Sequence, residues 1–418
     1  MIVTWIGRNY KKRLIYNTDT CVGCGLCVEV CPTGAISLGP IPQIATGKMD
    51  GKFAKITFDQ DKCQFCGLCA EICPINAIIF EINGQRIETL KEYPRIVGSI
   101  RIDKEKCIPC RICETICPTR CIEVRIQLKK KEDLVRYKKM PEKIEGEIKI
   151  NEEKCTFCGI CAELCDAIVI EWKKPDPSDL TFASSISVNL EKCDFCGLCA
   201  EICPDEAIEV KCITPVEREI EIPRITGDVV INEENCIYCG WCTNTCPRNA
   251  IEVKKRFEGK IKLFHIEKCD PLGCKACINI CPVNCWYIPK DPEREGKIAV
   301  NESLCIFCGS CERACPENII KVEITSVNII DPEVPSLWAG SRKRAIIDAT
   351  INRETPKHQR YAKIEIEERI PAEELREVPS VPEDVKDELQ QRLKRLEDEI
   401  SKIGIRRLIE RGKFKKLT

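Results

Sequence analysis

The 418-residue chain is poor in histidine and methionine, with two and three copies, and aromatic residues make up only 6% of it. No stretch approaches the roughly 18 consecutive apolar residues of a membrane span. Residues 1–13 contain neither the apolar run nor the small-residue cleavage site of a secretory signal. We therefore expect a cytoplasmic protein without a membrane span.

Motifs of common active sites are missing as well. The sequence has no G-x-G-x-x-G after a strand, no P-loop, no H-E-x-x-H and no nucleophile–base pair. Of its two histidines, His265 and His358, the first precedes a cysteine run and is interpreted as a surface or packing residue. A formal charge of -1 gives no bias toward nucleic acid. We expect no nucleic-acid partner, and no catalytic residues of the chain's own.

Cysteine is the exception, with 35 copies in 418 residues, which in a secreted chain would suggest a disulfide scaffold. In a cytoplasmic protein, thiols at this density indicate metal binding instead. Charged residues make up 31% of the chain, and lysine, glutamate and isoleucine are abundant. That bias is typical of hyperthermophile proteins, although an AT-rich genome would produce it too.

Thirty-two of the cysteines form eight runs of four, called runs one to eight in chain order. They are Cys21, Cys24, Cys27 and Cys31; Cys63, Cys66, Cys69 and Cys73; Cys107, Cys110, Cys113 and Cys117; Cys155, Cys158, Cys161 and Cys165; Cys193, Cys196, Cys199 and Cys203; Cys236, Cys239, Cys242 and Cys246; Cys269, Cys274, Cys277 and Cys281; Cys305, Cys308, Cys311 and Cys315.

The spacing within the runs indicates iron–sulfur clusters. Seven runs follow C-x2-C-x2-C-x3-C, and run seven opens with four residues between Cys269 and Cys274. Proline follows the fourth cysteine in seven runs, and Asp166 follows it in run four. In this signature the fourth cysteine ligates the other cluster of a pair. Zinc sites instead use two C-x2-C pairs separated by a longer loop. We expect eight [4Fe–4S] clusters, their iron held by the 32 cysteines.

Crossed ligation requires the runs to pair. If neighbours pair in order, one cluster takes Cys21, Cys24, Cys27 and Cys73, and the next takes Cys63, Cys66, Cys69 and Cys31. The same rule joins run three with four, five with six, and seven with eight. The expected ferredoxin pairs are then 1–97, 98–180, 181–258 and 259–328. Shifted pairing, or nested pairing of run one with run eight, is an alternative that leaves the ligand list unchanged.

Segments flanking the runs, such as 147–150 before and 77–80 after, carry β-branched residues typical of strands. Between the third and fourth cysteines, and just past the fourth, one short helical turn fits. The expected fold is α+β, with tandem β-α-β modules whose strands pair antiparallel. Such modules have little apolar core, so we expect the cluster-free chain to be largely unfolded.

The C-terminal segment 329–418 lacks the cysteine motif. Residues 345–351 and 361–367 partly alternate apolar and polar side chains and predict two strands. A helix is predicted from Pro382, with apolar residues at three- and four-residue steps. This stripe either packs on the protein itself or, as we expect, contacts a partner or a second copy. Its residues are Val385, Leu389, Leu393, Leu396, Ile400 and Ile403.

A few residues depart from the repeat. Cys121 and Cys285 stand where most other units have alanine and are interpreted as small packing residues, with a ligand role as the alternative. Cys212 follows a strand and is expected to be buried. Arg111 and Lys275 replace the glycine that follows the second cysteine in the other six runs. A cation there would raise a cluster's potential, unless solvent screens it.

These motifs resemble the bacterial-type ferredoxin family, and residues 15–325 resemble the archaeal polyferredoxins. The segments 38–40, 44–51 and 92–94 are most similar to the polyferredoxins of formylmethanofuran dehydrogenase. The resemblance implies tandem ferredoxin-like modules serving a methanogen redox complex, with hydrogenase and heterodisulfide reductase as alternative hosts.

An electron wire or buffer, without an active site of its own, explains the many clusters, with potentials near the roughly -400 mV of ordinary ferredoxins. A structural scaffold is the rival interpretation. Eight clusters at -2 each would bring the formal charge from -1 to about -17. Partners would then present basic docking surfaces.

Overall fold

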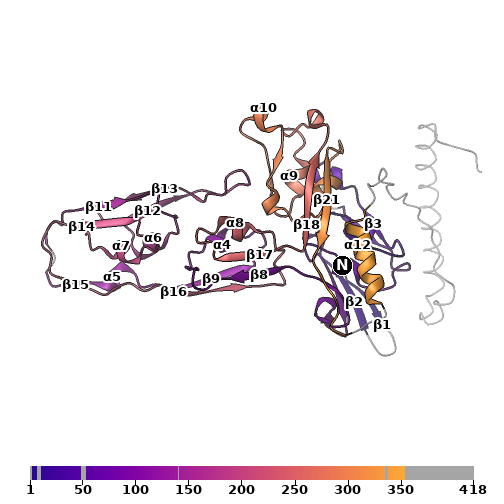
Figure 1. The fold of residues 1–418 in the computed structure, drawn as a ribbon, viewed down its shortest axis with the longest axis horizontal. Helices are drawn as coiled ribbons and strands as arrows, with labels where there is room; N and C mark the ends of the chain where they lie inside the picture. Colours follow the sequence, from indigo (N-terminus) through magenta and orange to yellow (C-terminus); the bar gives the residue numbers. More distant parts are fainter. Residues whose placement is uncertain (1, 7–10, 49–52, 140, 335–337, 354–418) are drawn as a thin grey trace, which may run out of the picture. The chain divides into compact units, whose positions relative to one another are not determined.

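A computed structural model describes residues 2–6, 11–48, 53–139, 141–334 and 338–353. The chain divides into two compact units, Met1–Ala362 and Lys363–Thr418, and every described residue belongs to the first. Within these residues, no helix has the length and apolar character that crossing a membrane requires. Figure 1 labels the helices and strands.

Each cysteine run contains one short helix. It begins two residues after the second cysteine, includes the third and ends before the fourth. The sequence analysis had also allowed a helical turn just past the fourth cysteine, but none begins directly after it. The residue before each helix has positive φ, which suits glycine. Arg111 (φ 63°) and Lys275 (φ 49°) adopt the same conformation. The helices are α1 (Leu26–Glu29), α3 (Leu68–Glu71), α4 (Ile112–Ile116), α6 (Ile160–Leu164), α7 (Leu198–Ile202), α8 (Trp241–Thr245), α9 (Ala276–Ile280) and α11 (Ser310–Ala314).

Module 1, residues 2–97, contains runs one and two. Strands β1 (Ile2–Ile6), β2 (Lys11–Tyr16), β5 (Ile78–Ile82) and β6 (Gln85–Arg86) form one sheet in the order β1-β2-β5-β6. On the other side of the runs, β3 (Ile36–Leu38) pairs with β4 (Ile56–Phe58). The remaining elements are α2 (Ile41–Ala45), η1 (Ile87–Thr89) and β7 (Arg95–Ile96), which pairs with β22 (Ile329–Ile330).

Module 2 is built from two separate segments, 98–127 and 226–255, and holds runs three and six. Strand β8 (Ser99–Ile102) pairs with β17 (Ile251–Lys254), and β9 (Ile122–Gln127) pairs with β16 (Thr226–Ile231). Both pairs are antiparallel and join strands that lie far apart in the sequence. Run three therefore packs with run six rather than with its neighbour.

Module 3, residues 128–225, is inserted between those segments and holds runs four and five. Strand β11 (Gly146–Ile150) pairs with β14 (Ile208–Cys212), and β12 (Ile168–Trp172) pairs with β13 (Ala183–Val188). At the entry and exit of the module, α5 (Lys131–Leu134) leads into β10 (Val135–Tyr137), which pairs with β15 (Arg218–Ile220). Figure 1 shows β11 and β14 of this module side by side.

The expected pairing of run three with four and of five with six is therefore wrong. The predicted boundary between residues 180 and 181 falls in the loop that joins the paired strands β12 and β13. All eight units carry nearly the same strand signals, so the sequence pattern does not determine which unit each one meets. Runs three to six pair in a nested order, with runs four and five between runs three and six. The nested alternative of run one with run eight is not observed, because β2 before run one pairs with β5 after run two.

Module 4, residues 257–327, holds runs seven and eight. Its long strands β18 (Phe257–Leu263) and β21 (Ile320–Val327) are antiparallel, and β19 (Trp286–Tyr287) pairs with β20 (Ala299–Val300). Short helices η2 (Ile266–Lys268), α10 (Pro292–Glu295) and η3 (Glu302–Leu304) complete it.

Residues 339–350 form helix α12 (Ala339–Thr350), so the strand predicted over 345–351 is wrong. The buried residues Ile346, Ala349 and Thr350 recur at helical spacing, which a short partly alternating segment had obscured. The helix contacts α1 and β21. The predicted strand 361–367 and the helix from Pro382 lie outside the described residues.

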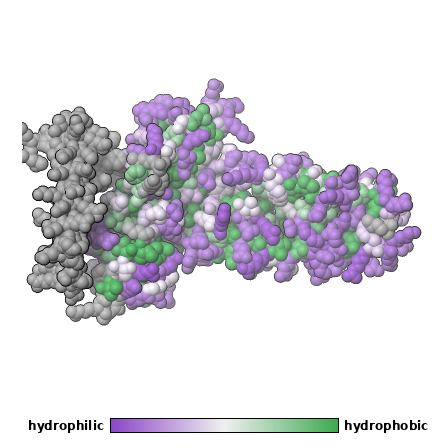
Figure 2. All heavy atoms as spheres, turned by 180° about the vertical axis from the view of Figure 1, so that it is seen from behind, coloured by the Kyte–Doolittle hydropathy of each residue, from purple (hydrophilic) through white to green (hydrophobic). Residues whose placement is uncertain are grey.

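The buried core is divided among the modules and is rich in isoleucine and cysteine. Cysteine thiols and β-strand side chains line the same core clusters, as expected for modules that fold around a metal group. On the face in Figure 2, hydrophilic side chains predominate, with smaller hydrophobic areas between them.

Candidate iron–sulfur sites

The first three cysteines of one run meet the fourth cysteine of its partner run. In module 2, Cys107, Cys110 and Cys113 line a small cavity with Cys246. In module 1, run two lines a similar cavity with Cys31 of run one. Three thiols thus come from one tight loop, and the fourth comes from just past the short helix of the partner run.

The same crossing recurs in the other runs, where each set of four thiols is close enough to interact electrostatically. We call each set a quartet, numbered by the run that supplies its first three cysteines. The fourth members of quartets one to eight are Cys73, Cys31, Cys246, Cys203, Cys165, Cys117, Cys315 and Cys281.

The quartets suit a group that brings positive charge. All 35 cysteines are free thiols. Burial raises the pKa of the Cys24, Cys27 and Cys311 thiols well above its ordinary value, and neighbouring thiols raise it further. Four thiolates need iron to offset that cost. In the described part of the chain, no group of three or more His, Cys, Asp or Glu side chains gathers closely enough to hold a single metal ion.

Backbone N–H groups point at the fourth cysteine of most runs. In seven runs its Sγ accepts a hydrogen bond from the N–H four residues later, over 3.2–3.5 Å. Run four has a shorter turn, and there Ile168 N donates to the carbonyl oxygen of Cys165 at 3.1 Å instead. Hydrogen bonds to ligand sulfurs tune cluster potentials, so this turn would influence the potential of a cluster held by the fourth cysteine.

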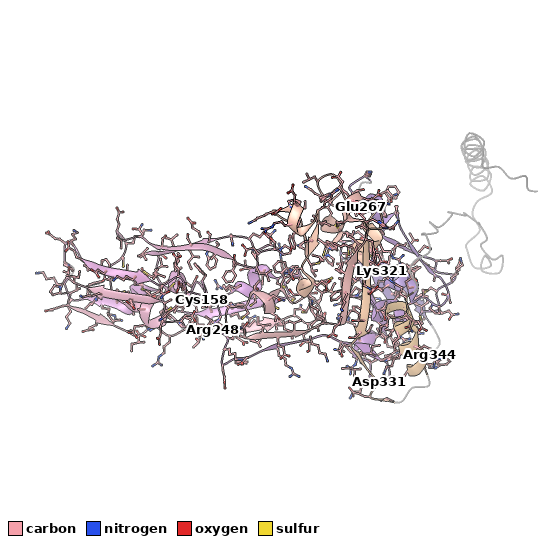
Figure 3. The ribbon with its side chains drawn as sticks, turned by 45° about the horizontal axis from the view of Figure 1, so that its top comes forward. Cys158, Arg248, Glu267, Lys321, Asp331 and Arg344 are labelled. Atoms are coloured by element: carbon pink, nitrogen blue, oxygen red, sulfur yellow. The ribbon has the colours of Figure 1, made fainter. Side chains whose placement is uncertain are left out.

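Contacts between modules bring quartets together. The thiols of Cys24 and Cys308 interact, which places quartet one beside quartet eight. Cys158 interacts with Cys110, which joins quartet four to quartet three. Arg248 of module 2 forms an ion pair with Asp205 of module 3, and Figure 3 labels Cys158 and Arg248 near this contact.

A tryptophan and a lysine join module 2 to module 4. Trp241 Nε1 donates to Val283 O over 2.7 Å. Lys255 Nζ donates to the backbone oxygen of Cys305 over 2.7 Å. The thiols of Cys305 and Cys239 both interact with Lys255, which therefore lies between quartets eight and six.

The residues outside the motif have different environments. Cys121 and Cys285 are buried beside the fourth cysteines of their own runs. Cys212 is only half-buried, contrary to expectation, and its Sγ donates to Thr214 O. His265 is on the surface, as expected, with its side chain 73% exposed and facing Glu267.

Comparison with known families supports iron–sulfur sites in this chain. The family model described as a 4Fe-4S dicluster domain matches residues 11–77, 100–168, 192–250 and 268–319, more than half of the chain. The chain belongs to this ferredoxin family. Two further dicluster models match 228–282 and 154–208. The matched segments imply different pairings of the middle runs. The segment 154–208 joins runs four and five, which agrees with the observed strand pairing. The segments 100–168, 192–250 and 228–282 join run three with four, five with six and six with seven, which the observed pairing does not.

Individual relatives are of the same kind. A polyferredoxin protein FwdF of Methanocaldococcus jannaschii is 47% identical over 96 residues, 23% of this chain and 26% of that protein. A subunit I of NADH-quinone oxidoreductase from Pelobacter propionicus is 32% identical over 76 residues, 16% of this chain and 41% of that protein. The matched segments thus span less than half of either relative.

A solved structure extends the likeness to most of the chain. It is a chain of the formate dehydrogenase–heterodisulfide reductase–formylmethanofuran dehydrogenase complex of Methanospirillum hungatei. Identity is 29% and the TM-score is 0.50, over 85% of this chain and 91% of that one. The chain is thus similar to polyferredoxins over most of its length, and its family matches support [4Fe–4S] clusters.

Proposed function

We propose that the chain is an electron-transfer wire of eight [4Fe–4S] clusters, each held by one quartet. The observation that carries this proposal is the crossed arrangement of thiols, repeated in all eight quartets. Iron–sulfur clusters would supply reversible one-electron chemistry there. The protein's own residues fix the sulfurs, donate hydrogen bonds to them and shield the sites from water.

The contacts between quartets define a branched path. From the far end of module 3 it runs through quartets five, four, three and six to quartet eight. There it divides, toward quartets one and two in module 1 and toward quartet seven in module 4. A branched wire connects more than two partners, or stores electrons from one partner for delivery to another.

The partner we propose is formylmethanofuran dehydrogenase of a methanogen, in the cytoplasm. The similarity to FwdF and to a complex that contains this enzyme supports the choice. A heterodisulfide reductase occurs in the same complex and is the second candidate host, and a hydrogenase is the third. We propose that the chain has no active site of its own and does not bind nucleic acid. We also propose that its C-terminal segment contacts a partner or a second copy of the chain.

The direct test is the iron and acid-labile sulfide content of anaerobically purified protein. Eight cubane clusters predict about 32 of each per chain. A fully occupied protein with about 24 or fewer would contradict the eight-cluster wire. Reversible reduction of every cluster distinguishes a wire from a scaffold. Co-purification from the native host then identifies the partner enzyme.

A further inference from the structure

Two cysteines outside the ligand set lie against cluster ligands in equivalent places. Cys121 Sγ is 3.5 Å from Cys117 Sγ, and Cys285 Sγ is 3.5 Å from Cys281 Sγ. Both side chains are buried, at 5% and 1% exposure. The equivalent position in runs one, two, five and six is alanine, and in run eight it is isoleucine. The fold therefore does not require a thiol at this position, and the two thiols are specific to runs three and seven.

Each thiol also contacts a second ligand of one quartet. The thiol of Cys121 interacts electrostatically with that of Cys236 and lies within hydrogen-bonding distance of that of Cys117, and both partners are members of quartet six. Cys285 is in the same relation to Cys305 and Cys281, both members of quartet eight. Quartets six and eight are the ones on either side of Lys255, at the junction of modules 2 and 4.

The direction of these hydrogen bonds follows from ligation. A cysteine that binds iron has lost its proton, so the only S–H left in each contact belongs to Cys121 or Cys285. A hydrogen bond donated to a ligand sulfur stabilises negative charge on the cluster, and the reduced cluster carries one charge more. The extra thiol therefore favours reduction of its own cluster.

Hydroxyl donors add to the same two quartets. Ser310 Oγ is 3.2 Å from Cys308 Sγ in quartet eight, at a position occupied by Leu, Ile, Trp or Ala in the other runs. Thr119 Oγ1 is 3.6 Å from Cys117 Sγ in quartet six. Quartets one and two have one hydroxyl neighbour each, Tyr16 beside Cys21 and Thr33 Oγ1 at 3.7 Å from Cys31.

We propose that Cys121 and Cys285 are S–H donors that make quartets six and eight the highest-potential clusters of the chain, where its first electrons reside. This inference rests on the proposed function and adds to it a storage site at the branch point. An electron entering from any end then reaches quartets six and eight downhill and leaves them when a partner withdraws it.

Potentiometric titration of anaerobic holoprotein, followed by electron paramagnetic resonance, tests the proposal. The first two electrons per chain should enter at a step that Cys121→Ala and Cys285→Ala each move to lower potential. At a fixed potential on that step, the reduced-to-oxidised ratio of the affected cluster should fall about three- to tenfold, the effect of one hydrogen bond. Cys285→Ser retains a donor and should restore most of the loss. Cys212→Ala is the matched control and should titrate like the parent.

The outcomes separate the two proposals. Alanine occurs at this position in four other runs, so the variants should keep the full iron content of the parent. Full iron content with an unchanged titration overturns the storage site while leaving the wire intact. Loss of iron from Cys121→Ala or Cys285→Ala would make that cysteine a ligand and overturn it too. Incomplete or irreversible reduction in the parent protein would instead contradict the wire itself.

Discussion

The ammonium group of Lys255 donates a hydrogen bond to the backbone oxygen of Ser303 over 2.6 Å. The same group reaches the backbone oxygens of Cys305 at 2.7 Å and Glu302 at 3.2 Å. One side chain of module 2 thereby holds the loop that begins quartet eight. Burial lowers the pKa of Lys255, and the thiols of Cys305 and Cys239 oppose this shift by favouring the charged form.

Replacing Lys255 with methionine should lower the potential of quartet eight and weaken the contact between modules 2 and 4. The positive charge near the cluster is lost, and three carbonyl groups lose a donor. Redox titration and the rate of electron transfer along the chain measure the two effects. The exposed neighbour Lys254 provides the control in Lys254→Met. Equal behaviour of the two variants would mean that Lys255 only fills space.

Arg342 on α12 should be important for the stability of module 1. Its guanidinium pairs with Glu71 over 2.6 Å and donates to the carbonyl oxygen of Cys66 over 2.7 Å. Removing one partner of a buried ion pair leaves the other charge unpaired, so Arg342→Ala should cost about 3–5 kcal/mol. Thermal loss of cluster absorbance reports the change.

Two further variants check that assignment. Arg344, labelled in Figure 3, lies on the same helix and is less buried than Arg342, and Arg344→Ala should leave the melting curve unchanged. Combining Arg342→Ala with Glu71→Gln should recover part of the loss, because no buried carboxylate is left unpaired. A double variant as unstable as Arg342→Ala would show that the arginine acts through packing alone.

Glycine should make the protein more stable than the native residue does at positions 111 and 275. Arg111 and Lys275 hold a left-handed backbone that costs an ordinary residue roughly 1–2 kcal/mol. Arg111→Gly and Lys275→Gly should therefore raise the temperature at which the clusters are lost. Gly197→Ala is the reciprocal control, because its methyl group meets no atom within 4 Å and only the backbone cost at φ 85° remains. If all three changes lower stability, local contacts outweigh the backbone preference.

Removal of the clusters should unfold the modules. The core contains the ligand thiols themselves, and burial favours their neutral form when iron is absent. Chelation under denaturant-free, anaerobic conditions should abolish helical and strand signals in circular dichroism, and reconstitution with iron and sulfide should restore them. A cooperative thermal transition of the cluster-free chain would contradict this expectation.

The cysteine spacing predicted the repeated unit well, because every cubane site needs the same local loop. Strands such as 147–150 and the antiparallel pairing were predicted correctly. The partner of each unit was not predicted correctly. Tertiary contacts decide whether run three pairs with run four or with run six, and the local cysteine and strand pattern does not encode them. The helix over 339–350 was missed because only three of its residues are buried, too few to make the helical period clear in the sequence. The environment of Cys121 and Cys285 had a visible signal, their replacement of alanine, but its meaning required knowing which quartet each one contacts.

The nesting of module 3 inside module 2 has a consequence for synthesis of the chain. The whole inserted module separates the first three cysteines of quartet three from the fourth. Cys113 therefore leaves the ribosome 133 residues before Cys246. Module 3 emerges complete in that interval. Its clusters can therefore be inserted first, while three cysteines of run three wait without their fourth ligand. For modules 2 and 3, cluster delivery should therefore proceed from the inner module outward, although module 2 begins first along the chain.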